Sequence, residues 1–271
     1  TAGNVPAHQA TKNMRIVLDQ LDPPRWPRLG AAPNVEYDVD GTRLHGPNGL
    51  GHTDFPCASL HHLPSSEKLL VELVKQYPHE LTVVCMGPLT VVARAMDLYP
   101  ELPSMVRRLI IVGGSIQEPG NAGPVSEFHF YCDAKAARYV IGSGANITLI
   151  PLDMMRKVLF APTELLAGGS ELSPVYPFLR QVIPYGISAT SRLYGIEGFH
   201  LKDVLGVVAV GQPTAIHTKH MHVDVETQGE LTRGMSVFDR RPWHTATPNV
   251  EVVVETEAND VRDYIRRVIG Y

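Results

Sequence analysis

Three stretches of the sequence decide the fold: LTVVCMGPLT at residues 81–90, LIIVGGS at 109–115 and ITLIPLD at 147–153. Each stretch starts with a short, mainly apolar run and ends in a turn that contains glycine or proline. Continuous apolar strands are buried on both faces, which is typical of parallel sheets. The predicted strands are Leu81–Cys85, Leu109–Val112 and Ile147–Leu152.

Segments with apolar residues at helical spacing lie around and between these strands. The alternation of strands and helices predicts an α/β fold, with a doubly wound, mostly parallel sheet flanked by helices. A carboxyl-terminal, β-rich extension is predicted to follow, with strands in 220–227, 231–239 and 249–256. The predicted helices are 6–21, 65–77, 89–98, 133–141, 203–210 and 259–269, with a mainly helical stretch over 160–200.

The composition predicts a folded chain with one core. Of the 271 residues, 44% are hydrophobic and 19% are charged, a balance that disordered chains do not have. We find no internal repeat, low-complexity segment or linker. The sequence therefore predicts a single domain over residues 1–271.

Charge and cysteine content exclude several classes of partner. Lys and Arg number 24 against 28 Asp and Glu, a net charge of −4, which disfavours nucleic acid and anionic membrane surfaces. No apolar run reaches the roughly 18 residues of a membrane span. Cys57, Cys85 and Cys132 show no CxxC spacing, so neither a disulfide framework nor a zinc site is indicated. We predict a cytoplasmic protein that binds neither membrane nor nucleic acid.

Polar residues gather in predicted turns beside the sheet, where α/β proteins bind their ligands. Their amides, imidazoles and carboxylates offer the paired donors and acceptors that sugar hydroxyls need. Taken singly, each group also has a simpler interpretation, as a Gly-Asn turn or a helix cap. The groups are Asn4, His45–Gly51, Gly120–His129 and Phe199–Asp203.

In their order and in the identity of their residues, these stretches resemble the inosine-uridine preferring nucleoside hydrolase family along almost the whole chain. The resemblance implies a homodimer or homotetramer that hydrolyses the N-glycosidic bond of a small ribonucleoside, releasing ribose and a free base for purine and pyrimidine salvage. It also implies water attack assisted by Ca²⁺, through an oxocarbenium-like transition state. The matching stretches are 2–5, 44–51, 87–90, 113–114, 120–121, 127–128, 151–153, Asp203 and 227–234.

The resemblance implies two metal ligands within the chain. Thr90 matches a threonine whose backbone carbonyl binds Ca²⁺, and Asp203 matches a late aspartate ligand. The family's DxDxxxDD cluster has no match here, and we expect it to lie before Asn4, with a first strand and helix, in a segment absent from the printed chain. Calcium needs six to eight oxygen ligands, several of them charged. We therefore expect residues 1–271 alone to bind Ca²⁺ weakly.

The resemblance also implies a set of substrate-binding residues. Asn121 and Glu127 match residues that bind the ribose, and Asn4 matches an asparagine near the sugar. His45 matches a histidine of a loop on the base side. His129 stands where the family usually has a second ribose-binding asparagine, and we expect it to bind substrate in that place.

Two departures from the family pattern leave an alternative open. Lys202 stands where many members have a histidine that protonates the leaving base, and is either that acid or a surface lysine. His200, two residues earlier, is a second candidate for the missing imidazole. Together with His129, these departures favour the alternative of a metal-free, catalytically inactive homologue that binds nucleosides or ribose. The sequence does not predict which base is preferred.

Overall fold

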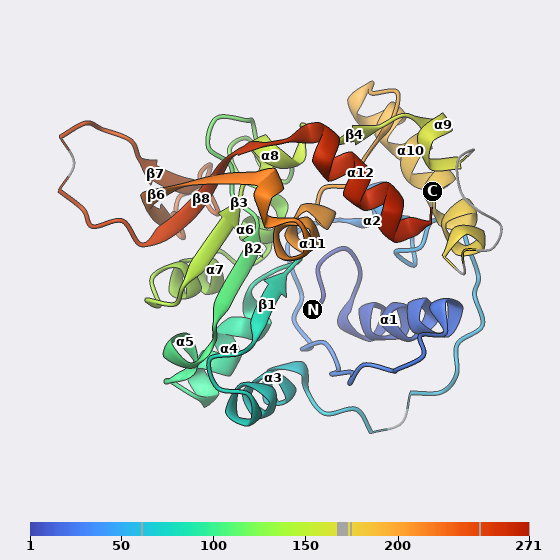
Figure 1. Cartoon of the computed structure of the whole chain (residues 1–271), viewed down its shortest axis with the longest axis horizontal. Coiled ribbons are helices and arrows are strands. Elements are labelled where there is room, and N and C mark those ends of the chain that lie inside the picture. The colour runs from blue at the N-terminus through green and yellow to red at the C-terminus, as the bar shows by residue number, and fades with distance from the viewer. Residues whose placement is uncertain (61, 167–172, 174, 244, 271) are drawn as a thin grey trace.

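A six-stranded mixed sheet forms the centre of the computed structural model, which describes residues 1–60, 62–166, 173, 175–243 and 245–270 (Figure 1). Its strand order is β1-β2-β3-β8-β6-β7. Strands β1, β2, β3 and β8 are parallel, whereas β6 pairs antiparallel with both β8 and β7. The predicted α/β fold with a mostly parallel sheet is confirmed. The strands are β1 (Thr82–Cys85), β2 (Arg108–Val112), β3 (Ile147–Ile150), β6 (Ile216–Val225), β7 (Ser236–Asp239) and β8 (Val250–Thr256).

Strand β2 shows why both faces of the sheet are covered. Leu109 and Ile111 pack into one buried cluster, and Ile110 and Val112 into another. Side chains alternate between the faces of a strand, so a strand with two buried faces is apolar throughout. Helices lie on both sides of the sheet in Figure 1. The covering helices are α3 (Ser66–Gln76), α4 (Thr90–Leu98), α5 (Leu102–Met105) and α7 (Ala134–Ile141) on the first face, and α8 (Leu152–Met155), α9 (Pro162–Leu166), α10 (Tyr176–Tyr194), α11 (Val204–Gly211) and α12 (Ala258–Ile269) on the second.

The three β-rich runs near the carboxyl end belong to this same sheet. Strand β8 pairs with β3, so the runs continue the central sheet. The predicted strand over 231–239 is wrong in its first half, because residues 230–234 form a turn. Gly234, at φ +79, donates its backbone N–H to the Glu226 carbonyl there. A strand continuing through this left-handed residue is excluded.

The long loop 22–64 is largely irregular in its described residues, but it contains the short helix α2 (Thr42–His45), and its Ala31 forms an isolated bridge with Ser65. Helix α1 (Ala7–Leu21) packs through Ile16 in a small separate cluster with Leu50, Phe55 and Phe178.

The described part of the predicted helical stretch 160–200 contains α9 and α10 and ends in strand β5 (Phe199–His200). Strand β5 pairs antiparallel with β4 (Leu159–Phe160) in a separate two-stranded sheet. Residues 167–172 and 174 of that prediction lie outside the described residues. Strand β3 ends earlier than predicted because Leu152 begins α8.

Within the described ranges, no helix has the length and apolar character needed to cross a bilayer.

The parallel strands bring the segments that follow them to one edge of the sheet. Gly113 lies after β2 and donates its N–H to the Ile150 carbonyl at the end of β3. Leu152, after β3, donates its N–H to the Gly114 carbonyl. Thr1 lies at the same edge, where its hydroxyl donates to the Pro88 carbonyl after β1. The fold thus gathers the predicted polar turns at the carboxyl ends of the strands.

Candidate active site

A cavity of about 580 Å³ contains most of the predicted site residues. They come from the amino terminus, α2, the loop after β2, α6 (Phe128–Cys132), β5 and the start of α11. Thr90 is not among the described residues that line the cavity. The predicted residues that do line it are Asn4, His45, Asn121, Glu127, His129, His200, Lys202 and Asp203.

Glu127 is buried at the N-cap of α6, where its two carboxylate oxygens have different surroundings. Oε2 accepts backbone N–H groups from Gly114 (3.2 Å), His129 (2.9 Å) and Phe130 (3.3 Å). Oε1 accepts no hydrogen bond from the described residues and lies 3.8 Å from His129 Nδ1. Burial raises the pKa of Glu127, although the nearby imidazole and amides oppose this rise. One oxygen therefore holds the backbone, and the other is available to a ligand.

The glycine pair after β2 makes this arrangement possible. Gly114 has φ +73, a conformation that side chains disfavour, and presents its N–H to Glu127. A Cβ atom on Gly113 would lie 2.6 Å from the ring of Phe130 and 3.2 Å from Glu127 Oε2. The backbone at Gly113 must approach α6 this closely for the Gly114 N–H to reach the Glu127 carboxylate.

Asn121 is oriented by a hydrogen bond from the backbone. Its Oδ1 accepts the N–H of Phe128 at 2.8 Å, and its own N–H donates to the Ser126 carbonyl at 3.1 Å. These bonds fix the amide side chain against the start of α6. Nδ2 donates to no described residue, so its two N–H groups are available in the cavity.

His129 lies between the end of β2 and Asp203. Its Nδ1 is 2.9 Å from the Val112 carbonyl, an obligate acceptor, so Nδ1 carries the proton. Its Nε2 then faces Asp203 Oδ1 at 4.0 Å. Burial lowers the pKa of His129, but the charges of Glu127 and Asp203 outweigh it, and the pKa lies above its usual value. The imidazole is thus a fixed polar group between two carboxylates.

Three basic side chains also line the cavity. Burial lowers the pKa of Lys202, of His200 and of His45. Lys202 Nζ lies 5.7 Å from the ring centre of Tyr194, and His200 Nδ1 is buried with no partner in the described part of the chain. The lysine is a cavity residue, so its interpretation as a surface lysine is not supported.

Thr90 is buried beside the cavity, at the first turn of α4. Its hydroxyl donates to Asp133 Oδ2 at 2.6 Å and lies 2.9 Å from the Tyr37 hydroxyl. Asp133 also caps α7 by accepting the N–H of Ala136. The Thr90 side chain therefore ties the long loop to two helices, and its predicted role as a carbonyl ligand stays a prediction.

The described residues do not on their own fit a calcium ion. No three His, Cys, Asp or Glu side chains among them converge in a way that would hold a metal. Glu127 has committed one oxygen to backbone amides, and Asp203 faces an imidazole. Calcium requires six to eight oxygens. The Ca²⁺ implied by the resemblance stays a prediction, and we derive no step through it.

Sequence reasoning missed several cavity residues. Asp38, Asp40 and Arg43 line the cavity from the long loop, and Tyr194 lines it from the end of α10. Asp38 is 3.5 Å from Arg233, an ion pair that joins this loop to the turn before β7. The length of the loop was the available signal, since long loops are often functional. No local pattern marks Tyr194.

Comparison with known proteins identifies the class. The family model of the inosine-uridine preferring nucleoside hydrolase matches residues 1–263. The chain belongs to this family, which confirms the resemblance, and it is a nucleoside hydrolase.

Individual relatives agree with this family. A probable uridine nucleosidase 2 from Oryza sativa subsp. japonica is 30% identical over 91% of this chain and 75% of its own length. The non-specific ribonucleoside hydrolase RihC from Escherichia coli O7:K1 (strain IAI39 / ExPEC) is 29% identical over 99% of this chain and 87% of its own. A plant nucleoside hydrolase structure, PpNRh1, matches with a TM-score of 0.91 and 24% identity over 99% and 88% of the two chains. This structural likeness supports the fold.

The partly buried His45 predicts a dependence of stability on pH. Its pKa is lowered in the folded protein, whereas in the unfolded chain it titrates near about 6.5. Below that pH the unfolded state takes up a proton that the folded state does not, so the free energy of unfolding falls. In urea unfolding, we expect the free energy of unfolding of His45→Gln to fall less than that of the parent protein as the pH is lowered through about 6.5. An equal loss in both proteins would contradict a His45 that stays neutral in the folded protein.

The shortage of oxygen ligands predicts weak calcium binding by residues 1–271. In isothermal titration calorimetry we expect no binding of CaCl₂ tighter than roughly 10⁻³ M, because Asp203 alone supplies too little charge. Asp203→Asn serves as the control and should give the same trace. A dissociation constant on the order of 10⁻⁶ M that is lost in this variant would show that the chain builds a complete site.

Proposed function

We propose that the cavity binds the ribose of a ribonucleoside and that the protein hydrolyses its N-glycosidic bond to ribose and free base. The observation that carries the proposal is the pair formed by Glu127 Oε1 and Asn121 Nδ2. One is an acceptor and the other a donor, and each lacks a described protein partner while its other end is anchored to the backbone. Adjacent sugar hydroxyls both donate and accept, so this pair matches them.

The charges in the cavity suit the electronic demand of glycosidic cleavage. As the bond to the base breaks, positive charge develops on the sugar ring. Glu127 is 2% exposed, and Asp203 lies across His129 from it. Carboxylates held in a partly dry site stabilise such a charge more strongly than water does, because they need no reorganisation. We propose that these two side chains provide that stabilisation.

The departing base needs a proton, and Lys202 and His200 are the candidate donors in the cavity. Lys202 lies at the cavity wall beside Tyr194, an aromatic side chain on which a base can stack. We propose that Lys202 donates a proton to a base nitrogen as the bond to the sugar breaks. Water then adds to the sugar carbon and releases a proton to solvent, from which Lys202 regains its proton, and this completes hydrolysis. If Ca²⁺ binds, as the resemblance implies, we propose Asp203 as one of its ligands, and the ion would supply Lewis-acid activation of the attacking water.

Substitution of Glu127 tests the proposal. We expect the parent protein to release reducing sugar from at least one of uridine, inosine and adenosine, assayed with added Ca²⁺ and with chelator. Glu127→Gln keeps the shape but removes the charge, and we expect kcat/KM to fall by about 100-fold or more.

Glu226→Gln is the matched control, because Glu226 also accepts two backbone N–H groups, from Gln228 and Gly229, but in a turn whose residues do not line the cavity. Its kcat/KM should stay within about twofold of the parent. Ribose binding without turnover of any nucleoside would contradict hydrolysis, and equal activity of Glu127→Gln and the parent would contradict the assigned site.

The role of Lys202 is tested with a riboside whose leaving group needs no proton, such as p-nitrophenyl riboside. Lys202→Ala should lose about 100-fold or more of kcat on a natural nucleoside but little on this activated substrate, since general acid catalysis contributes about 100-fold to 10,000-fold. His200→Ala is the comparison variant, and the same pattern in His200→Ala instead would assign the proton to the imidazole. Equal losses on both substrates in Lys202→Ala would exclude a proton-donating role.

A further inference from the structure

Asp153, at the first turn of α8, clamps the loop that follows β2. Its Oδ2 accepts the backbone N–H of Ile116 at 2.7 Å, and its Oδ1 accepts those of Gln117 at 2.8 Å and Glu118 at 3.2 Å. A single carboxylate thus satisfies three consecutive amides that no helix or strand would satisfy. The charged acceptor makes these bonds stronger than neutral ones.

Further contacts hold the same loop from other sides. Ser115 donates its N–H to Ser236 Oγ in β7, and Ser236 donates its hydroxyl back to the Ser115 carbonyl, at 2.8 and 2.9 Å. Arg156, directly after α8, forms an ion pair with Glu118. The first half of the loop is therefore fixed to β7 and to α8. Of Ser236, Arg156 and Asp153, only Asp153 accepts hydrogen bonds from three backbone amides of this loop.

The second half of the loop, residues 120–126, is connected to β2 through the first half and to α6 at its other end. Gly120 donates its N–H to Pro124, and Asn121 donates its N–H to Ser126, so residues 120–126 form a closed turn. A Cβ atom on Gly120 would lie 2.0 Å from the Gly123 carbonyl oxygen, so this closed turn requires glycine at that position. The connection of this turn to β2 runs through residues 116–118, whose amides Asp153 holds. Asn121 stands at the point where the two halves meet.

We propose that Asp153 is a positioning residue for the reaction, which sets the place of Asn121 against the ribose through the loop 115–121. Asp153 does not line the cavity in the described structure, so it acts on substrate only through this loop. The inference rests on the proposed function, because it assigns Asn121 to the sugar. A displacement of about 1 Å in a substrate-holding group can cost on the order of 100-fold in rate.

The kinetic test is a double-mutant cycle between positions 153 and 121. We expect Asp153→Ala to lower kcat/KM by about 10-fold to 100-fold in the parent protein but by less than about twofold in the Asn121→Ala background, because the two residues then act as a unit. Asp153→Asn keeps one acceptor oxygen and should recover part of the loss. A role in stability alone predicts the same factor in both backgrounds and no partial rescue, and would overturn the proposal.

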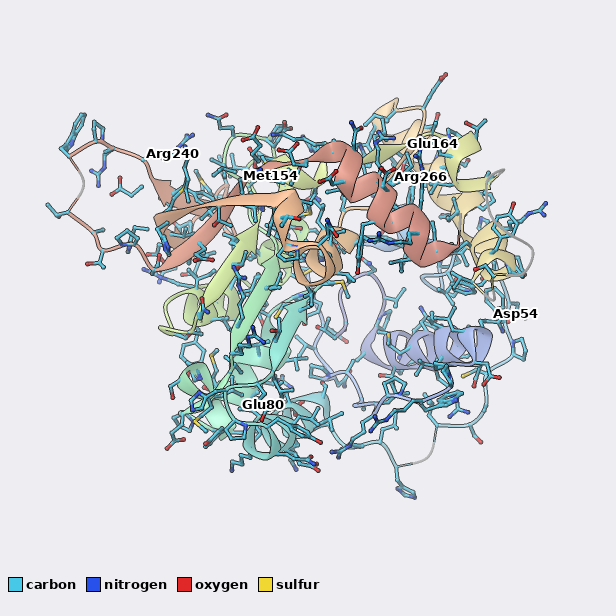
Figure 2. All side chains as sticks on the ribbon, in the orientation of Figure 1. Asp54, Glu80, Met154, Glu164, Arg240 and Arg266 are labelled. Atoms are coloured by element: carbon cyan, nitrogen blue, oxygen red, sulfur yellow. The ribbon has the colours of Figure 1, made fainter. Side chains whose placement is uncertain are left out.

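Glu164 provides the matched control. Like Asp153 it accepts a nearby backbone N–H, from Ala161 at 2.7 Å, and it also binds Arg262 and Arg266. Figure 2 shows Glu164 beside Arg266, between α9 and α12 and away from Met154, the neighbour of Asp153 in α8. We expect Glu164→Ala to lose stability but to retain kcat/KM within about twofold. Equal kinetic losses in Glu164→Ala and Asp153→Ala would overturn the proposal.

Hydrogen exchange separates failure of this inference from failure of the proposed function. In Asp153→Asn we expect the amides of Ile116–Glu118 to exchange faster, and the Phe128 amide, which Asn121 Oδ1 holds, to exchange at least about 10-fold faster. If the parent protein hydrolyses no nucleoside, the proposed function fails, and this measurement still decides whether Asp153 positions Asn121. Faster exchange confined to 116–118, with Phe128 protected as in the parent protein, would overturn the inference.

Discussion

The buried carboxylate of Glu127 is the contact on which the site depends. Through Oε2 it joins the Gly114 amide after β2 to the first turn of α6, and so fixes the sheet edge to the helix that bears His129. A buried carboxylate is costly unless its oxygens accept hydrogen bonds, and these amides lower that cost. The same bonds leave Oε1 directed to whatever fills the cavity. Structural and ligand-binding roles are therefore divided between two atoms of one side chain.

The rest of the cavity repeats this division. Asn121 uses its oxygen on the backbone and keeps its nitrogen for a ligand, and His129 uses Nδ1 on Val112 and turns Nε2 to Asp203. Glu127, Asn121 and His129 are thus each held at one end before any substrate arrives. Preorganised groups need little rearrangement as charge develops in a transition state, which is the main source of electrostatic catalysis. Basic side chains in the same cavity, Lys202 among them, are the proposed donors for the departing base.

The sequence predicted the elements whose signal is local. Leu109–Val112 was found because a strand buried on both faces is apolar at every position, and Asp203 because its matching stretch lies at a predicted helix start. The run over 231–239 misled because the mainly apolar stretch Met235–Phe238 directly follows Gly234, whose positive φ is visible only in the structure. Asp153 was recognised as part of a turn but not as a clamp, since its partner Ile116 lies 37 residues away. Contacts of this kind have no periodicity to reveal them.

The most direct measurement of the central claim is a crystal structure of the protein with ribose bound. The account predicts one sugar ring in the cavity, with a hydroxyl donating to Glu127 Oε1, another group accepting from Asn121 Nδ2, and Oε2 still bound to the amides of α6. A ribose bound elsewhere, or one that contacts neither side chain, would contradict it.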